Sequence, residues 1–158
     1  MANLAVISPS PDRIEVVFIG RRDGDPNLHL YAIGWSQGQG WASPGTREIG
    51  GAILLEPMSR IATSSRRPEF VDVFVVDQNG RLHNTFLDTA TGTWAGLRPV
   101  GGTNVKVADV VASVCRGSDD VEVLVTARDG SVWATHWDQS LPDYQPLERI
   151  ALLDLDLL

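Results

Sequence analysis

The sequence predicts an all-β chain made of three similar units, and three kinds of observation support this prediction. Short segments rich in valine, isoleucine and phenylalanine alternate with turn residues throughout the chain. No stretch of twelve or more residues shows the 3.6-residue period of an amphipathic helix. Three segments also align with one another, and the alignment places Ala5, Ala62 and Ala112 in register.

Each aligned segment contains two apolar stretches, which we expect to form its first two strands. They occupy residues 4–8 and 12–18, 61–65 and 69–75, and 111–115 and 119–125. The second stretch of each copy carries one acidic residue between branched apolar neighbours, at Glu15, Asp72 and Glu122. Because a buried, unpaired carboxylate is costly, we expect edge exposure or a hydrogen bond between units to satisfy it.

A turn and a third strand follow in each copy. Asn79-Gly80 and Asp129-Gly130 predict tight type I′ hairpins, in which both central residues have positive φ. The first copy has a longer loop around Asp23-Gly24. The third strands are expected over residues 28–33, 82–87 and 132–137. One aromatic position then recurs after each third strand, at Trp41, Trp94 and Tyr144.

Four short strands repeated about every 50 residues are typical of the blades of a β-propeller. The sequence therefore predicts one domain over residues 1–158, with repeats at about 4–51, 60–102 and 110–150. Propellers usually have about 4–8 blades, and three alone leave open edges, so we expect a homodimer that completes six blades. Residues 151–158 read as a half-buried strand that is exchanged with the partner. A self-packed strand, a frayed tail and a fragment of a longer propeller are the alternatives.

Composition and charge narrow the range of partners. The 158 residues include 13 Lys and Arg against 20 Asp and Glu, a formal net charge of −7. Nucleic acids and anionic membranes are bound through basic patches, so neither is expected as a partner. Cys115 is the single cysteine and cannot form an intrachain disulfide. Neither an apolar run of about 20 residues nor a basic signal-peptide start is found, which leaves the compartment open.

Motifs of common enzyme classes do not occur in the sequence. It has no Gly-x-Ser-x-Gly elbow, no His-Glu-x-x-His site and no sialidase-type Ser/Thr-x-Asp-x-Gly box. His29, His83 and His136 are dispersed along the chain without the spacing of a zinc site. We therefore expect no catalysis, no cofactor and no metal.

Three segments carry a resemblance to a known family. They are the strand at 12–18, the strand–turn–strand run at 71–83, and the ending Gly92-Thr93-Trp94-Ala95-Gly96-Leu97-Arg98-Pro99-Val100-Gly101-Gly102. They resemble the blade repeat of the bacterial PLL-type β-propeller lectins, and the resemblance covers about residues 4–150. It implies a propeller subunit that binds fucose-type monosaccharides in pockets between blades, without catalysis.

The chain departs from the family pattern at several aromatic positions. Leu97 and Leu147 stand where the family has a second tryptophan. His29 and His83 replace a third-strand aromatic residue that is retained at Trp133. Because sugar pockets use an aromatic face and a few directed hydrogen bonds, these changes favour an alternative. That alternative is a structural or protein-interaction propeller scaffold with degenerate sugar sites.

Eight residues are the candidates for sugar binding. They are Trp41, Trp94, Tyr144, Trp133, Trp137, His29, His83 and His136. The competing interpretation of the recurring aromatic position is packing between blades, because a repeated position usually serves the repeated fold. Satisfied structural histidines compete in the same way at His29 and His83. The adjacent arginines at 21–22 and 66–67 are interpreted as solvated loop charges.

Overall fold

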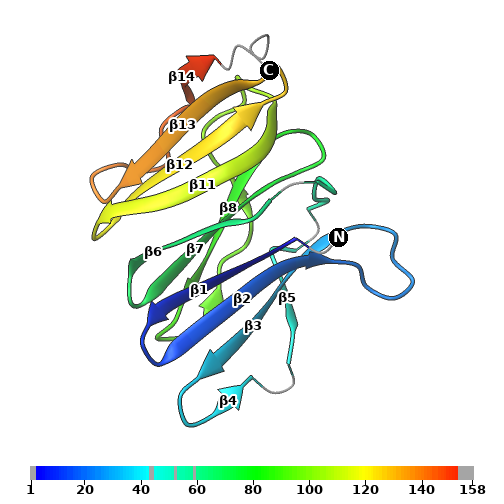
Figure 1. The fold of residues 1–158 in the computed structure, drawn as a ribbon, viewed down its shortest axis with the longest axis vertical. Helices are drawn as coiled ribbons and strands as arrows, with labels where there is room; N and C mark the ends of the chain where they lie inside the picture. The colour runs from blue at the N-terminus through cyan, green and yellow to red at the C-terminus, as the bar shows by residue number, and fades with distance from the viewer. Residues whose placement is uncertain (1–2, 43–44, 52, 59, 153–158) are drawn as a thin grey trace, which may run out of the picture.

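The computed structural model describes residues 3–42, 45–51, 53–58 and 60–152. Within these ranges all regular secondary structure is β-strand, which confirms the all-β prediction. A search of the same residues for a helix able to cross a membrane finds none. The strands form three antiparallel sheets that follow one another along the chain (Figure 1).

Each sheet is a meander in which consecutive strands pair. The first sheet contains β1 (Leu4–Ser10), β2 (Arg13–Gly20), β3 (His29–Ser36), β4 (Gly40–Trp41) and β5 (Arg47–Ile49). The second contains β6 (Ala62–Arg67), β7 (Phe70–Val76), β8 (Leu82–Asp88), β9 (Thr93–Trp94) and β10 (Arg98–Pro99). The third contains β11 (Val107–Gly117), β12 (Asp120–Ala127), β13 (Ser131–Asp138) and β14 (Glu148–Leu152). The predicted tail strand beyond Leu152 lies outside the described residues.

The same register recurs in the three sheets. The acidic residue of the second strand lies opposite a third-strand residue, in the pairs Glu15–Gly34, Asp72–Phe86 and Glu122–His136. The carbonyls of these third-strand residues accept hydrogen bonds from the backbone N–H groups of Ala42, Ala95 and Gln145. Trp41, Trp94 and Tyr144 each precede one of these donors, so they occupy corresponding positions.

The two short hairpins differ from the predicted type I′ turns. Gly80 has a φ of 73° and Gly130 a φ of 82°, whereas Asn79 and Asp129 do not have positive φ. The Gly80 N–H donates to the carbonyl of Asp77 at 3.0 Å, as in a four-residue turn that ends on a left-handed glycine. The type I′ prediction is therefore wrong, because the loop is one turn residue longer at its start.

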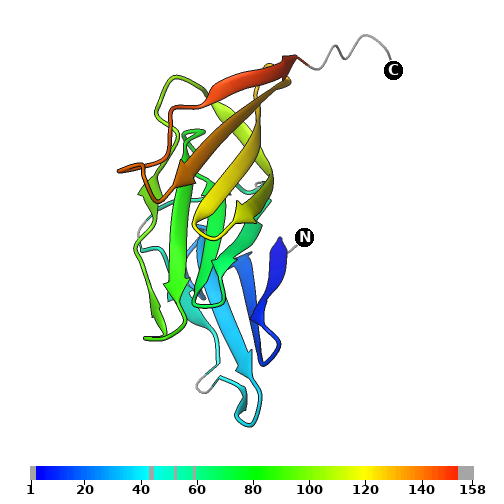
Figure 2. The ribbon, with the colours of Figure 1, turned by 90° about the vertical axis from the view of Figure 1, so that its left-hand side faces the viewer.

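The sheets pack in a row, with the second sheet between the other two (Figures 1 and 2). The apolar cluster between the first two sheets, which we call the first junction, is built around Val17, Leu30, Leu55, Val73 and Leu87. The cluster between the second and third sheets, the second junction, is built around Phe74, Val76, Val121, Val123 and Tyr144. In addition, β6 contacts both β1 and β11, so the first strands of the sheets are neighbours.

Burial along the second strands follows from this order of sheets. Residues 71–76 of β7 are all buried, because alternate side chains enter the first and the second junction. In β2 and β12 buried and half-buried residues alternate, because one face of each outer sheet is not covered. The three sheets do not close on themselves, and closure into a propeller stays a prediction.

Candidate ligand site at the edge of the first sheet

A buried ion pair lies on the face of the first sheet that packs against the second. Arg13 and Glu15 are two positions apart in β2, so their side chains lie on the same face. The Glu15 side chain is fully buried, and its Oε1 accepts a hydrogen bond from Arg13 Nε at 2.9 Å. Arg13 Nη2 lies 2.8 Å from the same oxygen. Arg13 Nη1 donates to the carbonyl of Thr89 at 3.3 Å, which ties the pair to the second sheet.

Gly34 makes room for the Glu15 carboxylate. A Cβ atom at position 34 would lie 2.8 Å from Glu15 Oε1 and 3.2 Å from Oε2. Within the described part of the chain, the buried Oε2 atom has no hydrogen-bond partner. Leaving a buried carboxylate oxygen unpaired is costly, so this atom is an acceptor available to a hydroxyl group or a water molecule.

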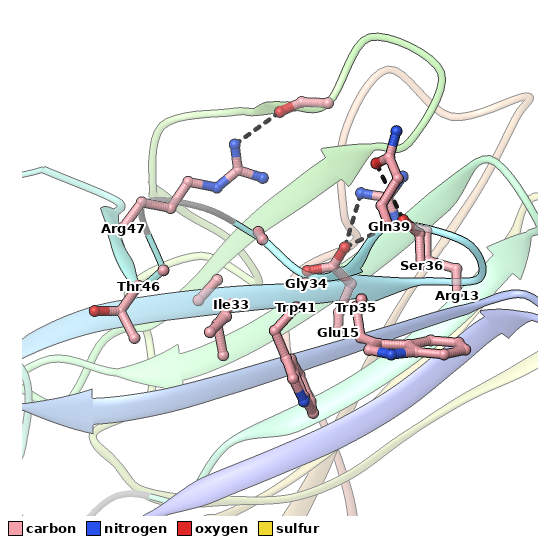
Figure 3. A pocket seen from close by; sticks show the side chains of 15 residues that line it. Arg13, Glu15, Ile33, Gly34, Trp35, Ser36, Gln39, Trp41, Thr46 and Arg47 are labelled. Carbon is pink, nitrogen blue, oxygen red and sulfur yellow. Dashed lines mark hydrogen bonds and ion pairs between the residues drawn. The ribbon is translucent and has the colours of Figure 1, made fainter.

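A cavity of about 540 Å³ lies around this pair at the outer edge of β3 (Figure 3). Both β4 and β5 pair with β3, and Ile33 lies between the two paired stretches. The polar lining includes Ser36, Gln39 and Arg47 besides the ion pair. Arg47 Nη1 donates to the carbonyl of Gly92 at 3.0 Å, so the second sheet closes one side of the cavity.

Two indoles form the aromatic part of the lining. Trp35 and Trp41 lie opposite each other in the β3–β4 pair, and Trp41 is 54% exposed. By the alternation of side chains they lie on the other face of the sheet from Glu15. Figure 3 shows both indoles on one side of β3, and Arg47 and Gln39 on the other. The polar and aromatic walls therefore meet around the edge of the sheet.

In the second junction, protein side chains occupy the corresponding space. Asp72 is buried there, and Arg66 Nε lies 3.0 Å from Asp72 Oδ2. The Arg66 guanidinium carbon lies 5.2 Å from the ring centre of Phe86 and 4.8 Å from that of Trp137. Because Arg66 is only 12% exposed, its interpretation as a solvated loop charge was wrong.

The first and second junctions differ at two corresponding positions. Phe86 stands in the second sheet where Gly34 stands in the first. Arg66 precedes the hairpin-closing pair Arg67–Phe70, and Pro9 precedes the corresponding pair Ser10–Arg13. The first junction has neither the aromatic ring nor the arginine side chain at these positions, so its edge stays open.

Burial dominates the electrostatics of the second junction. Desolvation raises the pKa of Asp72 to about 6, although the positive charge of Arg66 acts in the opposite direction. Burial also raises the pKa of the Tyr144 hydroxyl. Tyr144 packs edge-on against Phe74 at 5.7 Å and beside Trp137 at 6.4 Å.

The remaining aromatic candidates pack inside the fold. Trp94 lies against the first junction, and its buried Nε1 has no hydrogen-bond partner among the described residues. Trp133 and Trp137 both pack against the second junction. Trp133 Nε1 donates to Ser131 Oγ at 2.7 Å, which fixes the ring near the β12–β13 turn.

The histidine candidates are held by nearby carboxylates. His83 is buried, and its Nε2 lies 3.0 Å from Asp77 Oδ2. His29 has Asp25 and Glu48 on its two ring nitrogens, each at 3.0 Å. His136 is half-exposed on β13, with Nε2 at 4.0 Å from Asp138. These positions lie apart from the cavity lining.

The structure therefore does not gather the eight candidates into one site, and Trp41 alone among them lines the cavity. Arg13, Glu15, Gly34 and Arg47 were not among the candidates. One signal for them was available in the sequence. An acidic residue inside an apolar strand, with an arginine two positions earlier on the same face, indicates a buried ion pair.

Comparison with known proteins gives a likeness to solved structures. No protein family matches the chain, and no curated protein matches it. The chain is similar to the crystal structure of a triple arginine-to-alanine mutant of AofleA from Arthrobotrys oligospora, with a TM-score of 0.49 and 13% sequence identity. The match covers 96% of this chain and 57% of that one, so the chain spans somewhat more than half the length of AofleA.

Proposed function

We propose that this protein is a non-catalytic carbohydrate-binding subunit, and that a fucose-type monosaccharide binds in the cavity at the edge of the first sheet. The observation that carries the proposal is that Glu15, whose buried Oε2 has no partner among the described residues, lines the same cavity as the exposed indole of Trp41. A volume of about 540 Å³ is enough for a monosaccharide.

The lining residues divide the recognition of a sugar between them. The Glu15 carboxylate accepts hydrogen bonds from sugar hydroxyls, and its pairing with Arg13 holds it in one orientation. The guanidinium groups of Arg13 and Arg47 supply donors for ring and hydroxyl oxygens. The exposed Trp41 indole offers an apolar surface for the C–H face of the sugar.

The number of carboxylates supports binding without catalysis. Glycoside hydrolases use a pair of carboxylic acids on either side of the scissile bond. Among the described residues that line the cavity, Glu15 is the single acid. The described lining therefore lacks the second carboxylate that a glycoside hydrolase needs to supply both a general acid and a base or nucleophile.

A propeller architecture is part of the proposal. Three meander sheets packed face to face in a row, with their first strands adjacent, are what consecutive propeller blades require. In this interpretation the first and second junctions are grooves between blades. The expected repeats at about 4–51 and 60–102 span the first and second sheets, whereas the third sheet, from Val107 to Leu152, extends beyond the expected repeat at about 110–150 at both ends.

At the second junction, the side chains that fill the groove favour a scaffold role over sugar binding. Arg66, Phe86 and Trp137 occupy the space that a sugar needs there. A structural or protein-interaction scaffold with degenerate sugar sites accounts for this junction without a ligand. We therefore expect one carbohydrate site per chain at the first junction, and none at the second.

Isothermal titration of the 158-residue chain with L-fucose, D-mannose and D-galactose tests the proposal. We expect saturable binding of a fucose-type sugar at or below about 1 mM, with one site per chain. Glu15→Gln and Trp41→Ala should each weaken it at least about tenfold, whereas Met58→Ala, at a residue 80% exposed and outside the lining, should not. Absence of binding at about 10 mM of each sugar, or equal affinity of all variants, overturns the proposal.

A further inference from the structure

The first sheet has an apolar face that no described residue covers. The strand pairing places its side chains opposite to those that enter the first junction. Its apolar residues are Leu4, Val6, Ile14, Val16, Phe18, Tyr31, Ile33 and Trp35, and the register also places Trp41 and the His29–Glu48 pair on this first-sheet face. Leu4 is 60% exposed and Val6 58% exposed, and none of the eight residues is charged. A continuous apolar face of this size indicates an interaction surface.

The third sheet has an uncovered face at the other end of the row. This third-sheet face consists of Ala112, Val114, Glu122, Leu124, Thr126, Val132, Ala134 and His136. An arginine lies at its edge: Arg116 Nη2 is 3.3 Å from Asp120 Oδ1 and 3.4 Å from Glu122 Oε2. The face is therefore apolar along β11 and β12, with one acid–arginine group beside His136.

The two junctions inside the chain are made in the same way. The face that carries Glu15 is covered by the second sheet, and the face that carries Asp72 is covered by the third. The face that carries Glu122 is the next in this series, and none of the residues that the structure describes packs over it. The covering face in the second junction carries Trp137, whose counterpart in the first sheet is the uncovered Trp35.

The contact between Arg66 and Trp137 in the second junction has corresponding residues on the two uncovered faces. Arg116 corresponds to Arg66, and Trp35 corresponds to Trp137. Arg66 pairs with Asp72 and lies over Trp137, with 4.8 Å between its guanidinium carbon and the ring centre. Arg116 precedes the hairpin-closing pair of β11 and β12 as Arg66 does in β6 and β7. Arg116 is paired with Glu122, the counterpart of Asp72, but among the described residues no aromatic ring of the same copy lies over its guanidinium group.

We propose that two copies of this chain associate head to tail, with the first-sheet face of each copy packed on the third-sheet face of the other. Arg116 of one copy then lies over Trp35 of its partner, as Arg66 lies over Trp137 within the chain. Two copies then form two identical junctions, an arrangement with closed two-fold symmetry. Their six sheets fall within the range of about 4–8 blades in propellers.

Mass measurement on the unliganded 158-residue chain is the first test. Size-exclusion chromatography with light scattering should give twice the chain mass of 17.2 kDa. Val16→Asp and Leu124→Asp each place a carboxylate in the proposed interface, at residues that are only half-buried in one copy. Both variants should elute at the single-chain mass with an unchanged circular dichroism spectrum, while Met58→Asp should keep the double mass. A single-chain mass for the parent protein at about 50 µM overturns the proposal.

Mixing the two aspartate variants separates head-to-tail association from other arrangements. Each variant retains one intact face, so an equimolar mixture should contain a species of the double mass that neither variant forms alone. If two first-sheet faces paired with each other, Leu124→Asp alone would stay dimeric, and this result overturns the proposal. The sugar does not enter these measurements, so carbohydrate binding and association are able to fail independently.

Two further residues, the exposed Arg116 and the half-buried Trp35, keep the proposal testable if an aspartate variant does not fold. Arg116→Ala and Trp35→Ala should each raise the dimer dissociation constant by about tenfold. If the two side chains contact each other across the interface, the double variant should be weakened by less than the product of the single effects. Strictly multiplicative effects contradict the predicted contact.

Discussion

Gly34 lies directly opposite Glu15 in the β2–β3 pair, and the Glu15 carboxylate occupies the space that a side chain at position 34 would need. In the second sheet Phe86 lies opposite Asp72. The ring of Phe86 fills the groove there and packs against Arg66. The residue opposite the buried acid is therefore glycine at the junction with the open edge and phenylalanine at the filled junction.

Substitution of Gly34 by alanine should displace the carboxylate. The new Cβ would lie 2.8 Å from Glu15 Oε1, and the side chain could not keep its present bonds to Arg13. We expect a loss of about 1–3 kcal/mol in the free energy of unfolding by urea, together with loss of carbohydrate binding. Gly96→Ala is the matched control, because a Cβ at Gly96 meets nothing within 4 Å. Equal stability and affinity of the two variants would contradict this account.

Removal of Arg13 should destabilise the fold more than removal of both charges. Arg13→Ala leaves the fully buried Glu15 carboxylate without its counter-charge, which costs about 3 kcal/mol or more. The double variant Arg13→Ala with Glu15→Gln has no buried charge and should recover part of this loss. Urea denaturation of the two single variants, the double variant and the parent measures the coupling. A double variant less stable than Arg13→Ala would show that the ion pair is not the cause.

Asp72 should make stability depend on pH in the acid range. Burial raises its pKa to about 6, above that of an unfolded aspartate. The folded state therefore binds the proton more tightly, so this contribution to stability is complete below about pH 4 and declines as the pH rises through 6. Relative to Asp72→Asn, the parent protein should lose on the order of 2 to 3 kcal/mol between about pH 4 and 7.

The comparison with Asp72→Asn removes the contributions of the other carboxyl groups, which both proteins share. Urea denaturation at several pH values in this range gives the two profiles. Parallel profiles would mean that Asp72 titrates alike in the folded and unfolded states. Arg66→Gln removes the charge that opposes the shift, so it should move the decline to higher pH.

Much of the fold is predictable from local patterns. The run at 71–76 is apolar at every position except Asp72, which indicates a strand covered on both faces, and it lies between two junctions. The recurrence of Trp41, Trp94 and Tyr144 at one position is also borne out by the hydrogen-bond register. These features depend on spacing along one strand or one hairpin, which the sequence displays directly.

The surroundings of each position are not predictable in this way. Trp41 lies on the uncovered face of the first sheet, whereas Tyr144 is buried beside Trp137 on the face of the third sheet that packs against the second. The pairing of Arg66 with Asp72 depends on how a hairpin folds back over its own strand. Local patterns do not specify such tertiary contacts, so the sequence predicts a solvated charge at Arg66 where the structure has a largely buried ion pair.

Replacement of Phe86 by glycine should open the second junction. The variant keeps the Arg66–Asp72 pair but removes the ring beside it, so it reproduces the arrangement of Arg13, Glu15 and Gly34. Trp137 then supplies an aromatic wall next to a buried carboxylate. We expect a loss of about 3–5 kcal/mol in stability and an increase from one to two carbohydrate molecules bound per chain.

Phe86→Leu is the control, since leucine keeps most of the volume and should leave one site per chain. Calorimetric titration gives the stoichiometry, and circular dichroism confirms that each variant is folded. Phe86→Ala serves where the glycine variant is too unstable, because it also removes the ring. A folded variant with an opened groove that still binds one sugar per chain would mean that the difference between Gly34 and Phe86 does not determine which junction binds. The deciding difference would then be Arg66, which stands in the second sheet at the position that Pro9 has in the first. Comparison of Phe86→Ala with the double variant Arg66→Ala, Phe86→Ala would separate the two effects.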